Sequence, residues 1–233
     1  MTAIRRADAV GQPSETASMR GVVERLRENR LLPVIVIDDP ANGVPLARAL
    51  EEGGLPCVEI TLRTARALQA IEKISAECPT VFAGAGTVLT PQQAADALSA
   101  GAKFIVAPGF NPAMVDYCIE RGIPVFPGVA TPSEIEQALG RGLSVLKFFP
   151  AEQLGGIAYL KAIAAPYGKV GFIPTGGIAL SNLASYLASP RVVACGGSWI
   201  APAEWIAAAK FDRITEETRK AVAAAQAVNK ESK

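Results

Sequence analysis

The segment Ile123–Pro150, IPVFPGVATPSEIEQALGRGLSVLKFFP, decides the fold of this chain. It contains two short apolar runs, Ile123–Phe126 and Ser144–Phe149, which predict buried strands, and a helical pattern over Pro132–Gly140 between them. The helix follows a threonine and begins with a proline, which is typical of a helix start because the threonine caps the first turn. The segment therefore predicts a strand, a helix and a second, parallel strand.

The same alternation runs through the whole chain. Six further apolar runs predict strands, and they are Pro33–Ile37, Pro56–Thr61, Val81–Gly86, Phe104–Ala107, Val170–Pro174 and Val192–Gly196. Helical patterns lie between them, at Pro45–Glu52, Arg66–Glu77, Pro91–Ser99, Pro112–Arg121, Ile157–Ala164 and Leu180–Leu187. Eight such repeats predict an α/β fold, a single-domain (β/α)8 TIM barrel with a parallel sheet buried on both faces. An open doubly wound sheet is the alternative, but no G-x-G-x-x-G follows the first strand.

Both ends of the chain add to this expectation. Met1–Ala17 is polar, lacks the apolar core of a signal peptide, and is expected to be a disordered extension. A helix over Arg20–Asn29 is expected to cover the bottom of the barrel, and a helix over Ile214–Val228 follows the last strand. The barrel domain is therefore expected to span residues 18–233.

Composition excludes several classes of function. The 233 residues include 23 Lys and Arg and 22 Asp and Glu, with no long basic run, which argues against nucleic acid as a partner. No apolar stretch reaches transmembrane length. The four cysteines are scattered and form no CxxC pair, as expected for reduced thiols in the cytoplasm. There is no histidine, which rules out His-rich zinc sites, Ser-His-Asp triads and histidine acid–base catalysis.

Lys147 lies within the apolar run 144–149, where a lysine is costly to bury. Removal of its ammonium group from water favours the neutral amine, which is a nucleophile and forms Schiff bases with carbonyl compounds. The alternatives are a buried salt bridge and a side chain that reaches solvent at the strand end. Because side chains alternate along a strand, we assign Lys147 to the inside of the barrel, and Leu146 and Phe148 to the helices.

Glu59 is the second charged residue expected inside the barrel. It shares a strand face with Cys57 and Thr61. It can be a purely structural partner of Lys147, but a buried ion pair is weak evidence for stability, since desolvation can exceed the Coulombic gain. A carboxylate beside a desolvated amine can instead transfer protons as a general acid and base.

Polar groups at the ends of other strands are candidates for binding substrate, because active sites of such barrels lie at the carboxyl ends of the strands. Arg63 can bind a carboxylate in bidentate fashion, or it is a surface arginine. Thr87 can bond the same carboxylate, or it is a turn or cap residue. Glycine pairs follow strands seven and eight, at Gly176-Gly177 and Gly196-Gly197. Each can be a simple turn, but loops at these two places often bind phosphate.

Five motifs together resemble the 2-keto-3-deoxy-6-phosphogluconate (KDPG) aldolase family, which includes the 4-hydroxy-2-oxoglutarate (KHG) aldolases. The resemblance spans Leu31 to Ser198 and departs from the family at the N-terminal extension and at Phe110-Asn111-Pro112. The motifs are VEITLRT (58–64), GAGTVL (84–89), PGVATPSE (127–134), LKFFPAE (146–152) and PTGGI (174–178).

The resemblance implies a metal-independent class I aldolase on a (β/α)8 barrel, without a cofactor, usually a homotrimer and cytoplasmic. It implies that Lys147 forms the Schiff base and that Glu59 transfers protons. It also implies that Arg63 and Thr87 hold the pyruvate carboxylate. The phosphate-end positions that it implies are Thr175, Gly176, Gly177, Gly197 and Ser198.

The expected reaction is cleavage of KDPG, a phosphorylated keto acid of the Entner–Doudoroff pathway, to pyruvate and glyceraldehyde 3-phosphate. The nearest alternative is cleavage of 4-hydroxy-2-oxoglutarate to pyruvate and glyoxylate. A phosphosugar epimerase that uses metal needs histidine ligands that the chain lacks. A non-catalytic phosphosugar-binding barrel needs neither Lys147 nor Glu59.

Overall fold

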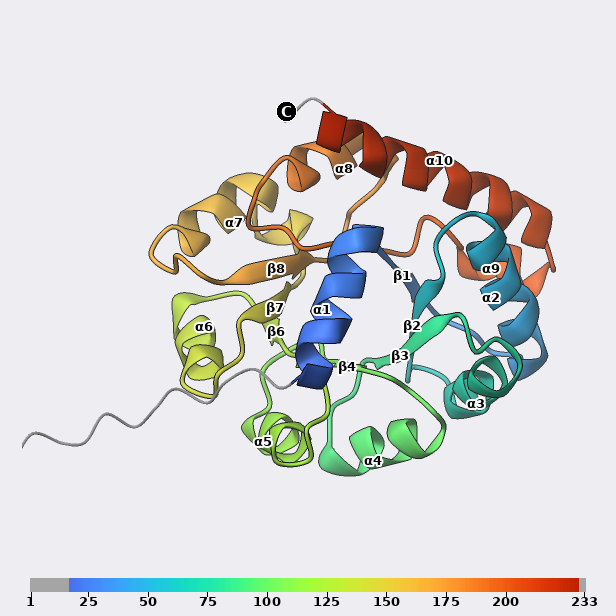
Figure 1. Ribbon diagram of the computed structural model, residues 1–233, viewed down its shortest axis with the longest axis horizontal. Helices are drawn as coiled ribbons and strands as arrows, with labels where there is room; N and C mark the ends of the chain where they lie inside the picture. Colours follow the sequence, from blue (N-terminus) through green and yellow to red (C-terminus); the bar gives the residue numbers. More distant parts are fainter. Residues whose placement is uncertain (1–16, 231–233) are drawn as a thin grey trace, which may run out of the picture.

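The computed structural model describes residues 17–230. In that range the strands pair in parallel, in a six-stranded sheet of order β5-β4-β3-β2-β1-β9 and a three-stranded sheet of order β6-β7-β8. The strands curl round a common centre and the helices surround them (Figure 1). The strands are β1 (Leu31–Ile35), β2 (Cys57–Thr61), β3 (Phe82–Gly86), β4 (Ile105–Val106), β5 (Val125–Phe126), β6 (Gly128–Val129), β7 (Val145–Phe148), β8 (Gly171–Pro174) and β9 (Cys195–Gly197).

The two sheets meet at two places. The strands β5 and β6 are separated only by Pro127, where the chain changes its partner from β4 to β7. On the other side, two isolated parallel bridges join Phe172 to Val192 and Thr175 to Gly196. The predicted α/β fold with a curled parallel sheet is confirmed. The predicted eight-stranded (β/α)8 barrel is not observed as one continuous sheet. The predicted fifth strand is divided at Pro127, which has no N–H to donate, and the second junction between the two sheets consists of isolated bridges alone.

Helices follow the strands in nearly the predicted positions. The ends of α4 and α8 agree with the prediction, and the others differ by one to a few residues; the helix α9 was not predicted. The helices are α1 (Ala17–Asn29), α2 (Gly43–Glu52), α3 (Ala67–Glu77), α4 (Pro91–Ser99), α5 (Pro112–Glu120), α6 (Pro132–Leu139), α7 (Gly156–Ala164), α8 (Leu180–Leu187), α9 (Ala203–Ala207) and α10 (Phe211–Lys230), with short 3-10 helices η1 (Pro40–Asn42) and η2 (Glu152–Leu154).

Side-chain caps explain where several helices begin. The Thr90 hydroxyl accepts a hydrogen bond from the Gln93 N–H at 3.2 Å at the start of α4. At the start of α6, Glu134 accepts hydrogen bonds from the Ala130 and Thr131 N–H groups at 2.7 and 2.9 Å. These bonds satisfy backbone donors that have no partner within the helix.

The helix α1 crosses the end of the sheet where the strands begin (Figure 1). Its Leu26 is fully buried, and the Arg25 guanidinium lies 5.2 Å from the ring centroid of Phe82, the first residue of β3. The predicted helix below the sheet is thus confirmed. The predicted disordered extension concerns residues 1–17, of which 1–16 lie outside the described residues; Ala17 is the first residue of α1.

The core is apolar apart from a few polar groups. Phe104 stacks on Phe82 with ring centroids 5.1 Å apart and meets the edge of Phe126 at 6.1 Å.

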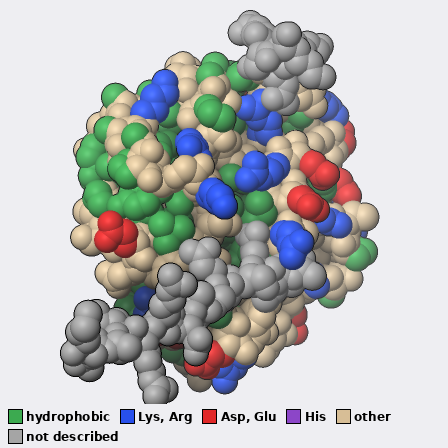
Figure 2. All heavy atoms as spheres, turned by 60° about the vertical axis from the view of Figure 1, so that its left-hand side comes forward, with side chains coloured by type: hydrophobic (Ala, Val, Ile, Leu, Met, Phe, Trp, Pro, Cys, Tyr) green, Lys and Arg blue, Asp and Glu red, His purple; other side chains and the backbone are tan. Residues whose placement is uncertain are grey.

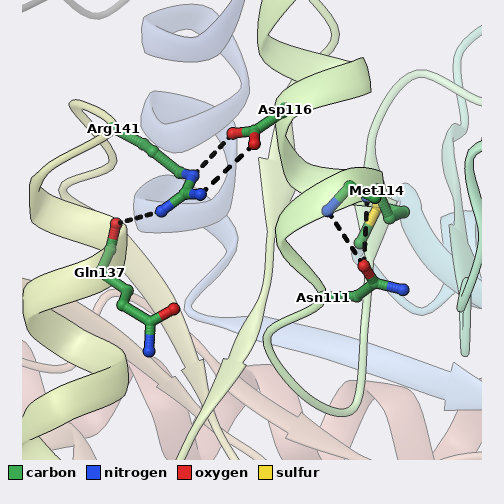
Figure 3. A network of polar contacts seen from close by, with 6 residues as sticks. Asn111, Met114, Asp116, Gln137 and Arg141 are labelled. Carbon is green, nitrogen blue, oxygen red and sulfur yellow. Dashed lines mark hydrogen bonds and ion pairs between the residues drawn. The ribbon is translucent and has the colours of Figure 1, made fainter.

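On the outside, Arg141 forms a two-bond ion pair with Asp116 at 2.6 and 3.3 Å and links the end of α6 to α5 (Figure 3). This contact holds two neighbouring helices together at the surface.

The surface carries spaced charges and an apolar area. On the face in Figure 2, Lys and Arg side chains lie near the middle, and hydrophobic side chains gather to their left. The exposed large hydrophobic residues include Leu89 and Leu180. Along residues 17–230, no helix has the length and apolar character needed to cross a membrane.

Candidate active site

Lys147 of β7 and Glu59 of β2 form an ion pair in the interior, with 3.2 Å between the lysine Nζ and the glutamate Oε1. Lys147 is 5% exposed and Glu59 is 0% exposed. The other carboxylate oxygen of Glu59, Oε2, is buried and has no hydrogen-bond partner in the described part of the chain. The two residues stand 88 positions apart in the sequence, and the curl of the sheet brings them together.

Small and aromatic neighbours make room for this pair. Gly86 of β3 lies beside Glu59, and a Cβ there would be 2.1 Å from Oε1. The Phe149 ring centroid lies 5.5 Å from the Lys147 Nζ, which is within range of a cation–π contact. Phe148 points to the other face, where its ring stacks on Tyr159 of α7 with centroids 6.0 Å apart. The predicted alternation along this strand is therefore observed.

The arrangement can transfer protons next to a nucleophile. Burial of two charges costs free energy that their attraction does not always return, so the pair is weakly explained by stability. A lysine amine that has lost its water shell can attack a carbonyl carbon. The free Glu59 Oε2 is a buried acceptor able to bond a further polar group.

Arg63 and Thr87 lie at the carboxyl ends of neighbouring strands. Thr61 of β2 pairs with Gly86 of β3; Thr87 follows Gly86 directly, and Arg63 stands two residues after Thr61. Arg63 is exposed and Thr87 is half-buried. Thr87 has a φ of 56°, a left-handed conformation that is strained for a threonine and is often found at functional sites.

The two predicted glycine loops lie next to each other. Thr175, directly after β8, is buried and forms a bridge with Gly196 of β9. A Cβ on Gly196 would be 2.3 Å from the Thr175 hydroxyl, so this close approach requires glycine. Gly176 and Gly177 have φ angles of 101° and 77°, which also favour glycine.

The second loop ends at an exposed serine. Gly197 is buried at the end of β9, and Ser198 follows it at the surface. A Cβ on Gly197 would overlap the Trp199 ring, so glycine is needed here as well. The structure thus brings Thr175, Gly176, Gly197 and Ser198 to one side of the strand ends.

Three side chains near the loops were not singled out by the sequence. Glu152 lies in η2 after the Lys147 strand, and its Oε1 accepts a hydrogen bond from the hydroxyl of Tyr186 in α8. The Trp199 Nε1 is buried without a partner among residues 17–230. Glu152 belongs to a motif that the sequence does show, but no periodicity indicates its contact with Tyr186.

Three of the four buried thiols are poor candidates for a second nucleophile. Burial raises the pKa of Cys57 to about 12 and that of Cys118 to about 12, and it also raises the pKa of Cys195. A thiol with a raised pKa is protonated and unreactive at neutral pH. Within the described range, no three His, Cys, Asp or Glu side chains are grouped so as to hold a metal ion.

Comparisons with known proteins show the family to which this chain is similar. Residues 22–217 match the family model of the KDPG and KHG aldolases. The 2-dehydro-3-deoxy-phosphogluconate aldolase of Treponema pallidum is 54% identical, over 83% of this chain and 92% of the relative. The KHG/KDPG aldolase of Escherichia coli K12 is 45% identical, over 84% of this chain and 92% of the relative.

Solved structures show the same fold. The KDPG aldolase of Legionella pneumophila, with pyruvate captured at low pH as a covalent carbinolamine intermediate, superposes with a TM-score of 0.82 at 42% identity, over 84% of this chain and 96% of that one. The enzyme of Zymomonas mobilis ZM4 with 3-phosphoglycerate gives a TM-score of 0.82 at 39% identity, over 88% and 96%.

The fold and these similarities define an aldolase, a lyase with an α/β fold and a curled parallel sheet. The chain belongs to the KDPG and KHG aldolase family.

Proposed function

We propose that this chain cleaves KDPG to pyruvate and glyceraldehyde 3-phosphate through a Schiff base on Lys147. The observation that carries the proposal is the buried pair of Lys147 and Glu59, 3.2 Å apart, with one Glu59 oxygen left free. A nucleophilic amine and a carboxylate that moves protons are the two groups that the reaction requires. The relative from Legionella pneumophila, which holds pyruvate as a covalent carbinolamine, supports the covalent step.

The reaction begins when the Lys147 amine attacks the 2-keto carbon of the substrate. Loss of water gives a protonated Schiff base, and Glu59 transfers the protons of this step. Glu59 then removes the C4 hydroxyl proton, the C3–C4 bond breaks, and its electron pair passes to the iminium group. Glyceraldehyde 3-phosphate leaves. The remaining enamine takes a proton at C3, and water releases pyruvate and the free Lys147 amine.

The two ends of the substrate have separate binding groups. Arg63 and Thr87 are proposed to hold the pyruvate carboxylate, because a guanidinium and a hydroxyl both donate to carboxylates. Thr175, Gly176, Gly177, Gly197 and Ser198 are proposed to line the phosphate end, with backbone N–H groups of the glycine loops as donors. The Thr175 N–H is not one of these donors, because it bonds the Phe148 carbonyl at 2.9 Å. The relative from Zymomonas mobilis with 3-phosphoglycerate supports a phosphorylated ligand. The proposed reaction uses no metal ion and no cofactor.

The architecture and assembly of this enzyme are also proposed. The continuity of the chain from β5 to β6 through the single residue Pro127, and the bridges between β8 and the chain at residues 192–196, support a (β/α)8 barrel formed by the two sheets together. The hydrophobic area in Figure 2 and the exposed Leu89 and Leu180 support contact between copies, as in a homotrimer. A cytoplasmic location and a separate N-terminal extension before α1 stay predictions.

Cleavage of 4-hydroxy-2-oxoglutarate is a second candidate activity. The similarity to the KHG/KDPG aldolase of Escherichia coli favours it. The proposed catalytic pair is the same for both substrates, and only the aldehyde end differs. Comparison of kcat/KM for the two substrates in one preparation decides between them.

Glu59→Gln tests the proposed roles, because it keeps the size of the side chain and removes the acid–base function. We expect kcat for KDPG cleavage to fall by a factor of about 10² to 10⁴. Pyruvate followed by borohydride should still label Lys147 in this variant. Wild-type cleavage by Glu59→Gln contradicts the assignment of Glu59, and binding of KDPG without cleavage by the native protein indicates a non-catalytic barrel.

A further inference from the structure

Tyr186 and Glu152 form a contact that the proposed reaction does not use. Tyr186 of α8 is fully buried, whereas Glu152 in η2 is exposed. The Tyr186 hydroxyl donates to Glu152 Oε1. Glu152 stands five positions after Lys147 on the segment that leaves β7, so this contact joins that segment to α8.

The backbone is shaped to admit this contact. A Cβ on Gly156 would lie 2.9 Å from Glu152 Oε1 and 3.3 Å from the Tyr186 hydroxyl oxygen. A Cβ on Gly177 would lie 2.6 Å from both the Cβ and the Cγ of Glu152. Both glycines have left-handed φ angles, 63° and 77°. The Glu152 side chain is therefore packed directly against the loop proposed to bind phosphate.

The same segment is bonded to that loop through the backbone. The Ala151 N–H donates to the Thr175 carbonyl at 2.8 Å, and the Glu152 N–H donates to the Gly176 carbonyl at 3.0 Å. From α8, the Asn182 side-chain amide donates to the Gly177 carbonyl at 3.0 Å. The Glu152 segment thus bonds the loop from one side and α8 bonds it from the other. The hydrogen bond from Tyr186 to Glu152 joins these two elements directly.

A carboxylate beside the phosphate loop repels an anionic ligand unless a hydrogen bond fixes its direction. Like charges at short range disfavour each other, and a phosphate carries up to two negative charges. The Tyr186 hydroxyl bonds one carboxylate oxygen and fixes the direction of the side chain. Burial, followed by the hydrogen bond with Glu152, raises the pKa of Tyr186, so its hydroxyl remains a protonated donor.

We propose that the Tyr186–Glu152 contact is a specificity device for the phosphorylated end of the substrate. Tyr186 is a positioning residue that keeps the Glu152 carboxylate away from the phosphate and keeps the Gly176-Gly177 loop in place. It thereby favours an aldehyde that carries a phosphate over one that lacks it. This inference rests on the proposed function, because it concerns the distal end of the same site.

The test is the variant Tyr186→Phe, which removes only the hydroxyl. We expect KM for KDPG to rise about ten-fold, as expected for loss of one charge-assisted hydrogen bond. The kcat for KDPG and both constants for 4-hydroxy-2-oxoglutarate should change less than about two-fold. Labelling of Lys147 by pyruvate and borohydride should stay unchanged, because pyruvate does not occupy the phosphate end.

A second variant separates charge from structure. In Tyr186→Phe with Glu152→Gln, the released side chain is neutral, so KM for KDPG should return to within about three-fold of the native value. The matched control is Tyr167→Phe, whose hydroxyl also donates to a glutamate, Glu136 at 3.0 Å, but on the outer surface. This control should leave both substrates unaffected.

The inference fails if Tyr186→Phe has the same effect on both substrates, or if the double variant shows no recovery. Either result assigns Tyr186 a purely structural role. These outcomes differ from failure of the proposed function, in which the native protein cleaves neither substrate and pyruvate leaves no label on Lys147.

Discussion

The substitution Gly86→Ala should displace the Glu59 carboxylate, although it replaces no charged residue. A Cβ at position 86 would lie 2.1 Å from Glu59 Oε1, 2.6 Å from its Cγ and 2.7 Å from its Cδ. Real Cβ atoms essentially never approach closer than 3.0 Å, so the carboxylate must move by about 1 Å. The same Oε1 atom contacts the Lys147 Nζ at 3.2 Å, and that contact must lengthen or break.

A misplacement of this size lowers the rate of an enzymatic step about 100-fold. We therefore expect kcat/KM of Gly86→Ala for KDPG to fall by about that factor, measured from the rate of pyruvate release. Circular dichroism and a urea titration should show that the variant is folded. The matched control is Gly168→Ala, since a Cβ there meets no atom within 4 Å. Cleavage by Gly86→Ala within two-fold of the native rate would refute the role given to the Glu59 position.

Three further predictions concern stability and pH. Arg30→Met removes guanidinium bonds to the Leu187 and Ala225 carbonyls, at 2.7 and 3.2 Å, and should lower the free energy of unfolding in urea by about 3 kcal/mol; an unchanged midpoint contradicts this. Burial raises the pKa of Cys57 from 9.0 to about 12, so its stabilising contribution is complete below pH 9 and is lost as the pH rises toward 12, at up to about 1.4 kcal/mol per pH unit. Urea midpoints of Cys57→Ala should therefore fall less steeply above pH 9 than those of the native protein, and parallel curves count against the claim. Arg141→Gln breaks the partly exposed pair with Asp116 and should cost under about 1 kcal/mol, a difference that disappears in 1 M NaCl; a cost that persists in salt indicates packing instead.

Much of the fold follows from local patterns in the sequence. Continuous apolar runs predict the buried parallel strands, and threonine or asparagine followed by proline predicts where α4, α5 and α6 begin. The first strand begins at Leu31, two residues before its predicted start at Pro33. The prediction is wrong here because proline is usually found at the first residue of a strand, whereas Pro33 lies inside this one. The helix α9 is only five residues long, too short for a helical period to be recognised.

Local sequence patterns also predict part of the candidate site. Strand alternation places Lys147 and Glu59 on inward faces, but the distance between them depends on how the sheet curls. The contact of Tyr186 with Glu152 joins residues 34 positions apart and depends on left-handed glycines at 156 and 177. Such contacts leave no periodic signal, so only the structure reveals them.

Borohydride trapping with pyruvate tests the central claim most directly. In the proposed mechanism pyruvate forms a Schiff base with Lys147, and borohydride reduces such a Schiff base to a stable adduct that peptide mass mapping can locate. The account predicts one adduct per chain, on Lys147, and none in Lys147→Ala, which should also have lost cleavage of KDPG. An adduct on a different lysine, or cleavage by Lys147→Ala, contradicts it.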